Sequence, residues 1–139
     1  MIAYFDSSAF VPLILDEPSS ERVMRLWLQV DRVASVRLLY VESRAALARA
    51  HRQRRVEEGR FAEAVGLLEE LYGDVDQIDV DESLVRQAGE LSQREALRGY
   101  DAVHLAAAER LAGDDVLFVS GDRALCGAAR RAGLQVSAL

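Results

Sequence analysis

The chain has 139 residues, half of them hydrophobic, and a formal net charge of −6. This length predicts one domain over residues 1–139, and the absence of a long apolar run or a leader-like N-terminus predicts a cytoplasmic protein. All 17 basic residues are arginine, which excludes enzymes that need a lysine at the reacting centre, such as P-loop nucleotide-binding proteins, haloacid-dehalogenase-type phosphotransferases and Schiff-base enzymes.

The first half of the chain alternates apolar runs typical of strands with segments in which apolar residues recur at helical spacing. The runs are residues 2–5 and 33–36. The helical segments are residues 9–14, 23–27, 38–50 and 61–72, and Gly73 ends the last of them. Within residues 38–50 the spacing predicts that the inward-facing side chains are Leu38, Val41, Ala45 and Ala48.

The second half of the chain repeats this alternation. Residues 74–80 alternate acidic and apolar side chains, which fits an exposed edge strand or the approach to one, and Asp81 can cap the helix that follows. A further helix is expected from near Asp101 to Leu111. Four consecutive apolar residues at 116–119 predict a strand covered on both faces, with a helix after it and a last strand at 134–136. The pattern indicates an α/β sandwich with a mainly parallel sheet.

Four carboxylates are expected at one rim of this sheet. Asp6 and Asp122 follow strongly predicted strands, Asp101 opens a helix, and Glu42 lies in the first turns of another helix. Ligands of such sheets bind beyond the carboxyl ends of the strands. Taken singly, the three aspartates could instead be helix caps and Glu42 a solvated side chain.

If the four acids converge, they need a compensating charge. Two like charges about 4 Å apart repel by roughly 4 kcal/mol at an effective dielectric constant near 20. A donor set of oxygens without a histidine and cysteine cluster favours Mg²⁺, with Mn²⁺ as a substitute, over Zn²⁺, and the single cysteine, Cys126, excludes a thiolate cage. Magnesium held in this way commonly meets phosphate groups, so the acids favour cleavage of a phosphodiester.

Four segments of the chain resemble the signature segments of PIN-domain ribonucleases, and their order and spacing are most similar to the VapC toxins of VapBC toxin–antitoxin pairs. The segments are YFDSSA at residues 4–9, VES at 41–43, LRGYDAVHLA at 97–106 and VSGD at 119–122. The resemblance implies a three-layer α/β/α sandwich, Mg²⁺-dependent cleavage of RNA, inhibition by a small VapB-like antitoxin, and a homodimer.

The resemblance also implies roles for individual residues. Asp6, Glu42 and Asp101 match the three firmest metal-site acids of the family, and Asp122 matches the more variable fourth. We expect Asp6 and Asp101 to hold the main ion, and Glu42 and Asp122 to complete a second, weaker site or to bind through water. Two hydroxyls are expected to support these acids: Ser120 beside Asp122, and Ser7, which could equally cap a helix.

Two further features allow more than one interpretation. His104 lies three residues after Asp101, and packing beside the site is the interpretation we favour over a role as a base. An arginine-rich segment, residues 44–60, is either a solvated helix face or a contact for RNA or antitoxin. Arg49 is its best candidate contact, because it follows Glu42 by two helical turns. A catalytically idle PIN-like binding module, a phosphatase, or a nuclease acting on structured DNA remain alternatives to the ribonuclease.

Overall fold

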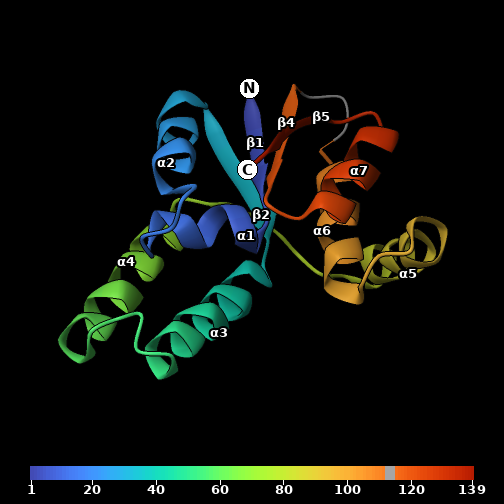
Figure 1. Cartoon of the computed structure of the whole chain (residues 1–139). Coiled ribbons are helices and arrows are strands. Elements are labelled where there is room, and N and C mark those ends of the chain that lie inside the picture. The colour runs from blue at the N-terminus through green and yellow to red at the C-terminus, as the bar shows by residue number, and fades with distance from the viewer. Residues whose placement is uncertain (112–114) are drawn as a thin grey trace.

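The computed structural model describes residues 1–111 and 115–139. Five strands form one sheet in which every neighbouring pair is parallel, in the order β3-β2-β1-β4-β5. Helices cover both faces of the sheet (Figure 1), so the predicted three-layer α/β/α sandwich is confirmed. In the described residues, no helix combines the length and the apolar character that crossing a membrane requires.

The elements alternate along the chain much as the sequence pattern predicts. The strands are β1 (Ile2–Phe5), β2 (Arg32–Val36), β3 (Asp76–Ile78), β4 (Val116–Ser120) and β5 (Gln135–Ala138). The α-helices are α1 (Ser7–Phe10), α2 (Ser20–Gln29), α3 (Leu39–Arg52), α4 (Phe61–Gly73), α5 (Glu82–Glu95), α6 (Gly99–Glu109) and α7 (Arg123–Arg131). Two short 3₁₀ helices, η1 (Val11–Leu13) and η2 (Glu58–Arg60), follow α1 and precede α4.

The strand order creates a crevice beside the central strand. From β1 the chain proceeds to β2 and β3 on one side of the sheet and then crosses to β4 and β5 on the other. In open parallel sheets, ligands bind where the order reverses in this way, outside the carboxyl ends of the two strands concerned. Here that point lies beyond β1 and β4, where Asp6 and Asp122 follow the two strands.

Alternating side chains of the strands supply two separate cores. Ala3 and Phe5 face the layer of α1 to α4, whereas Tyr4 and Phe118 face the layer of α5 to α7, and all four residues are completely buried. Successive residues of a strand point to opposite faces, so a single apolar run serves both cores. Residues at the ends of β1 and β4 are therefore held rigidly from both sides.

The predicted inward face of α3 is wrong. Val41 is exposed, and the buried residues of the helix are Leu39, Ser43, Leu47 and Ala50. Alanines at several positions of this helix fit either face, so the sequence pattern allows two registers that differ by one or two residues. Burial of the larger Leu39 and Leu47 decides between them, because larger apolar side chains gain more from leaving water. This rotation brings Glu42 to the edge of the sheet.

Two other boundaries differ from the prediction. Helix α6 begins at Gly99, two residues before Asp101, and its N-cap residue is Arg98. Strand β5 lies at Gln135–Ala138 rather than at residues 134–136, because Gly133 and the end of α7 occupy the approach to it. Because α6 begins at Gly99, Asp101 lies in the first turn of the helix and is not its N-cap residue.

Candidate active site

Asp6 is the most deeply buried of the four acids, with 4% of its surface exposed. It caps α1, because its Oδ1 accepts a hydrogen bond from the Ala9 backbone nitrogen at 3.1 Å. The hydroxyl of Ser8 also donates to Oδ1, and that of Ser120 donates to Oδ2, each at 2.6 Å. Burial raises the pKa of Asp6 above the ordinary value of an aspartate, while nearby His104 and these hydrogen bonds lower it in part.

The two serine hydroxyls also join β1 to the segment after β4. Ser8 Oγ accepts a hydrogen bond from the Gly121 backbone nitrogen at 2.7 Å, and Ser120 Oγ accepts one from the Asp122 backbone nitrogen at 3.0 Å. Each hydroxyl thus donates to Asp6 and accepts from the loop that carries Asp122. Ser120 therefore orients the Asp6 carboxylate and the Asp122 backbone.

Asp101 and Asp122 share one positive charge. The guanidinium of Arg98 donates from Nε to Asp101 Oδ2 at 2.9 Å and from Nη2 to Asp122 Oδ2 at 3.3 Å. Asp122 also caps α7, since its Oδ1 accepts from the Leu125 backbone nitrogen at 2.8 Å. The Arg98 side chain is 81% exposed, so water screens both ion pairs and leaves the guanidinium free to exchange for another cation.

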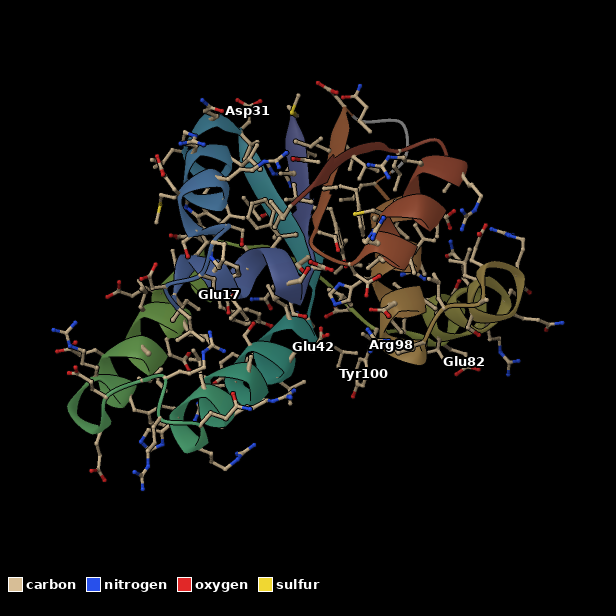
Figure 2. All side chains as sticks on the ribbon, in the orientation of Figure 1. Glu17, Asp31, Glu42, Glu82, Arg98 and Tyr100 are labelled. Carbon is tan, nitrogen blue, oxygen red and sulfur yellow. The ribbon has the colours of Figure 1, made fainter. Side chains whose placement is uncertain are left out.

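Glu42 reaches the site from the opposite helical layer. Its Oε1 lies 2.7 Å from Nε2 of the buried His104 on α6, and its Oε2 accepts a hydrogen bond from Ser7 Oγ at 3.3 Å. The Glu42 side chain is only 18% exposed. Figure 2 labels Glu42 at the start of α3 and Arg98 at the start of α6, on either side of the carboxyl ends of the strands.

A groove leads from Glu42 along α3. It has a volume of about 540 Å³ and is lined on one side by Ser7 and η1 and on the other by successive turns of α3. Glu42 and Arg49 both line it, together with Arg55 from the turn after the helix. The groove is therefore acidic where it meets the sheet and carries Arg49 farther along α3, whereas Arg55 pairs with Glu17, which also lines the groove.

The donor set suits a hard divalent cation, but the side chains do not form a finished coordination cage. Among residues 1–111 and 115–139, no three acidic, histidine or cysteine side chains are grouped closely enough to hold an ion as they stand. Magnesium commonly takes one or two carboxylates directly and completes its shell with water. The oxygens of these acids fit such an ion, provided that the Arg98 guanidinium leaves Asp101 and Asp122.

The structure brings all six predicted acids and serines to one region of the molecule and adds residues that sequence reasoning missed. Ser7 contacts Glu42, whereas Ser120 contacts Asp6 and not the Asp122 carboxylate. The missed residues are Ser8, Arg98 and Tyr4, and His104 was assigned to packing alone. Arg98 could have been found by its spacing of three from Asp101. No local spacing could indicate the contact of His104 with Glu42, because 62 residues separate them.

Two comparisons with known proteins show the family, and a third shows the fold. The family model that describes the PIN domain matches residues 3–131. The chain is 37% identical over 136 residues to ribonuclease VapC45 of Mycobacterium tuberculosis, covering 98% of this chain and 94% of that protein. Its fold is similar to PAE2754 of Pyrobaculum aerophilum, with a TM-score of 0.73, 20% identity and coverage of 98% and 92% of the two chains. It is also similar to VapBC2 of Rickettsia felis bound to a promoter DNA fragment, with a TM-score of 0.67, 13% identity and coverage of 100% and 99%.

Proposed function

Because the chain belongs to the PIN-domain family and is a full-length relative of VapC ribonucleases, we propose that it is a metal-dependent endoribonuclease, the toxin of a type II toxin–antitoxin pair. A small VapB-like antitoxin would neutralise it. The name of the relative at 37% identity supports RNA as the substrate, and the VapBC2 complex, at lower identity, supports the fold alone.

One observation carries the enzymatic part of this proposal: a nearly buried carboxylate is held by hydroxyls at the crevice beyond β1 and β4. Asp6 keeps its position through Ser8 and Ser120, although burial opposes its ionisation. A protein that needed only a helix cap here could use an exposed residue at lower cost. The other three acids lie at the same rim. Without an ion, Arg98 donates hydrogen bonds to Asp101 and Asp122, and His104 contacts Glu42.

In the proposed mechanism, the chain positions an RNA phosphate at this rim. Asp6 and Asp101 would hold a magnesium ion, with Glu42 and Asp122 binding through water or at a second site. A bound ion would polarise a phosphate oxygen and lower the pKa of a coordinated water. Ser8 and Ser120 fix the orientation of the Asp6 carboxylate, and Arg98, once displaced from Asp101 and Asp122, is close enough to neutralise phosphate charge.

Cleavage assays on a mixed panel of RNAs and DNAs test the proposal. We expect the purified protein to cut single-stranded or loop RNA in Mg²⁺ or Mn²⁺, to stop when a chelator is added, and to leave DNA intact. RNA binding without cleavage in either metal would indicate the idle binding module instead. Preferential cleavage of structured DNA, or release of phosphate from a monoester alone, would favour the other two alternatives.

Arg49 is the proposed contact for the RNA backbone beside the acids. It lines the same groove as Glu42, two helical turns along α3. Replacing Arg49 by Gln should remove about one phosphate contact, so the slope of log Kd for RNA against log salt should fall by about 1. Arg25→Gln is the matched control, because Arg25 pairs only with exposed Glu21 on α2 among the described residues and should leave the slope unchanged. An unchanged slope for Arg49→Gln would place the RNA elsewhere.

The antitoxin and a second copy of the chain are the proposed protein partners. The groove along α3 is the surface that we assign to the antitoxin, because a bound segment there would cover Glu42 and Arg49. For the homodimer, we favour the apolar depression between α5 and α6, which includes the exposed side chains of Val85 and Tyr100.

A further inference from the structure

A buried histidine links the two helical layers of the molecule at the candidate site. His104 lies on α6 with 2% of its surface exposed, and both of its ring nitrogens have partners. Nδ1 lies 2.9 Å from the Tyr4 hydroxyl, and Nε2 lies 2.7 Å from Glu42 Oε1. Glu42 belongs to α3 and His104 to α6, so their contact joins helices that flank the sheet from opposite sides, and Tyr4 belongs to the central strand β1.

The chemistry of these groups sets the direction of the hydrogen bonds. An ionised carboxylate only accepts hydrogen bonds, so Nε2 of His104 must carry a proton and donate it to Glu42. In the neutral ring, Nδ1 is then an acceptor, and the Tyr4 hydroxyl is its donor. A tyrosine hydroxyl has an ordinary pKa of about 10, so at neutral pH it keeps the proton that it donates.

Tyr4 is an unusually rigid starting point for this chain of hydrogen bonds. Its ring is completely buried and stacks on Phe118 with the centroids 5.4 Å apart and an angle of 5° between the planes. The His104 ring meets it edge-on, at 5.9 Å and 79°. The β1 backbone and two neighbouring rings thus fix the hydroxyl, and through it the plane of the imidazole.

Glu42 has little else to hold it in place. Its second oxygen has a longer hydrogen bond, 3.3 Å from Ser7 Oγ, and its neighbour on α3, Val41, is 52% exposed. A glutamate side chain loses rotamer entropy when it is fixed, so a short bond from a rigid donor is needed to keep one orientation. The donor comes from α6, on the other face of the sheet.

We propose that Tyr4 and His104 are positioning residues that hold the Glu42 carboxylate toward Asp6 and Asp101, through the order Tyr4 hydroxyl, His104 Nδ1, His104 Nε2–H and Glu42 Oε1. The inference for cleavage rests on the proposed function. The proton on Nε2 and the dependence of the imidazole on Tyr4 do not rest on it, and they can be measured without metal or RNA.

Nitrogen NMR of the metal-free protein tests the order of the bonds. The chain has two histidines, and His51→Gln removes the signals of the other one. We expect His104 to carry its proton on Nε2, and Tyr4→Phe, which deletes only the buried hydroxyl, to shift its Nδ1 resonance. Tyr72→Phe removes a hydroxyl that donates to the Arg37 carbonyl and should leave His104 unchanged. A proton on Nδ1, with or without one on Nε2, or no response to Tyr4→Phe, would overturn the proposal.

Two substitutions of His104 separate positioning from packing. His104→Gln offers an N–H near the position of Nε2, whereas His104→Leu fills the space without a donor. In the active protein, loss of a residue that orients a ligand costs about 10–100-fold in activity or metal affinity. We expect the Leu variant to lose that much in kcat and in Mg²⁺ affinity measured by calorimetry, with KM for RNA unchanged, and the Gln variant to recover most of both. Equal behaviour of the two variants would overturn the positioning role.

Failure of the proposal can be told from failure of the proposed function. If the wild-type protein does not cleave RNA, the proposed function fails, and the NMR measurements still decide whether Tyr4 and His104 orient Glu42. If it cleaves RNA but His104→Leu retains the wild-type kcat and Mg²⁺ affinity, the positioning role fails and the function stands.

Discussion

Asp101→Asn is expected to lower kcat for RNA cleavage by about 10²–10³-fold or more, the range seen when one group that stabilises developing charge is removed. The substitution keeps the shape of the side chain and removes the negative charge that would bind the ion. Because the N-cap of α6 is Arg98, Asp101 has no capping role to lose. Its ion pair joins it to a largely exposed arginine, so the variant should fold like the wild type.

The matched control for this experiment is Asp79→Asn. Asp79 also pairs with a largely exposed arginine, Arg37, but it follows the edge strand β3, which β2 separates from β1, and it has no contact with the four acids among the hydrogen bonds and ion pairs of the described residues. Its kcat should equal that of the wild type. Circular dichroism and the urea midpoint check the fold of both variants. Wild-type cleavage by Asp101→Asn, in a preparation without contaminating nuclease, would contradict the assignment of the active site.

The strands and their positions along the chain could be predicted well, because each is marked by a short run of neighbouring residues. Residues 116–119 are apolar without interruption, as expected for a strand covered on both faces, and β4 lies there. Asp81 was expected to cap the next helix, and its side chain accepts from the Leu84 backbone nitrogen. Both predictions depend only on a few neighbouring residues and on which residue types favour a buried strand or a helix N-cap.

The contacts within the site could not be predicted, because they depend on distant residues and on helix rotation. The alanine-rich sequence of α3 fits two faces, and only packing against the sheet selects the one that buries Leu39 and Leu47. The spacing of His104 from Asp101 suggests a base on the same helical face, and packing beside the site is the interpretation that the sequence favours. The actual partner of His104 comes from another helical layer. Sequence spacing identifies neighbours on one helix, not neighbours across a sheet.

The capping interpretation proved right for two acids without excluding a role at the site. Asp6 and Asp122 accept the backbone hydrogen bonds of helix caps, whereas Asp101 does not. One carboxylate oxygen satisfies the helix in each case, and the other faces Ser120 or Arg98. Capping therefore fixes the orientation of these acids at the rim.

Asp6→Asn should make the metal-free protein more stable while it abolishes cleavage. Asparagine is as good a helix cap as aspartate, and it removes a charge whose burial raises the pKa of Asp6. In a chelator at about pH 7, we expect the free energy of unfolding to rise by roughly 0.5–2 kcal/mol, the range of single stabilising substitutions. Saturating Mg²⁺ should reverse the order, because an ion at about 100 times its Kd stabilises only the wild type, by about 2.7 kcal/mol.

The pH dependence of this difference has a definite sign. The pKa of Asp6 is higher in the folded than in the unfolded protein, so the wild type loses stability as the pH rises through the folded value. The advantage of Asp6→Asn should therefore vanish in acid, below the ordinary aspartate pKa, and grow toward neutral pH in urea unfolding. Equal midpoints for the two proteins at every pH in chelator would contradict it.

Asp81→Asn is the matched control, because it replaces another capping aspartate and should behave in the opposite way. A hydrogen bond from Arg110 is the largest cause that lowers the pKa of Asp81, to about 2. The wild type therefore gains stability from this charge above the ordinary aspartate pKa and loses it as the pH falls through about 2. We expect Asp81→Asn to be less stable than the wild type at neutral pH, with or without Mg²⁺. The two Asp→Asn substitutions are thus expected to change the free energy of unfolding in opposite directions. That result would show that the charge of Asp6 lowers stability, which a purely structural helix cap does not require.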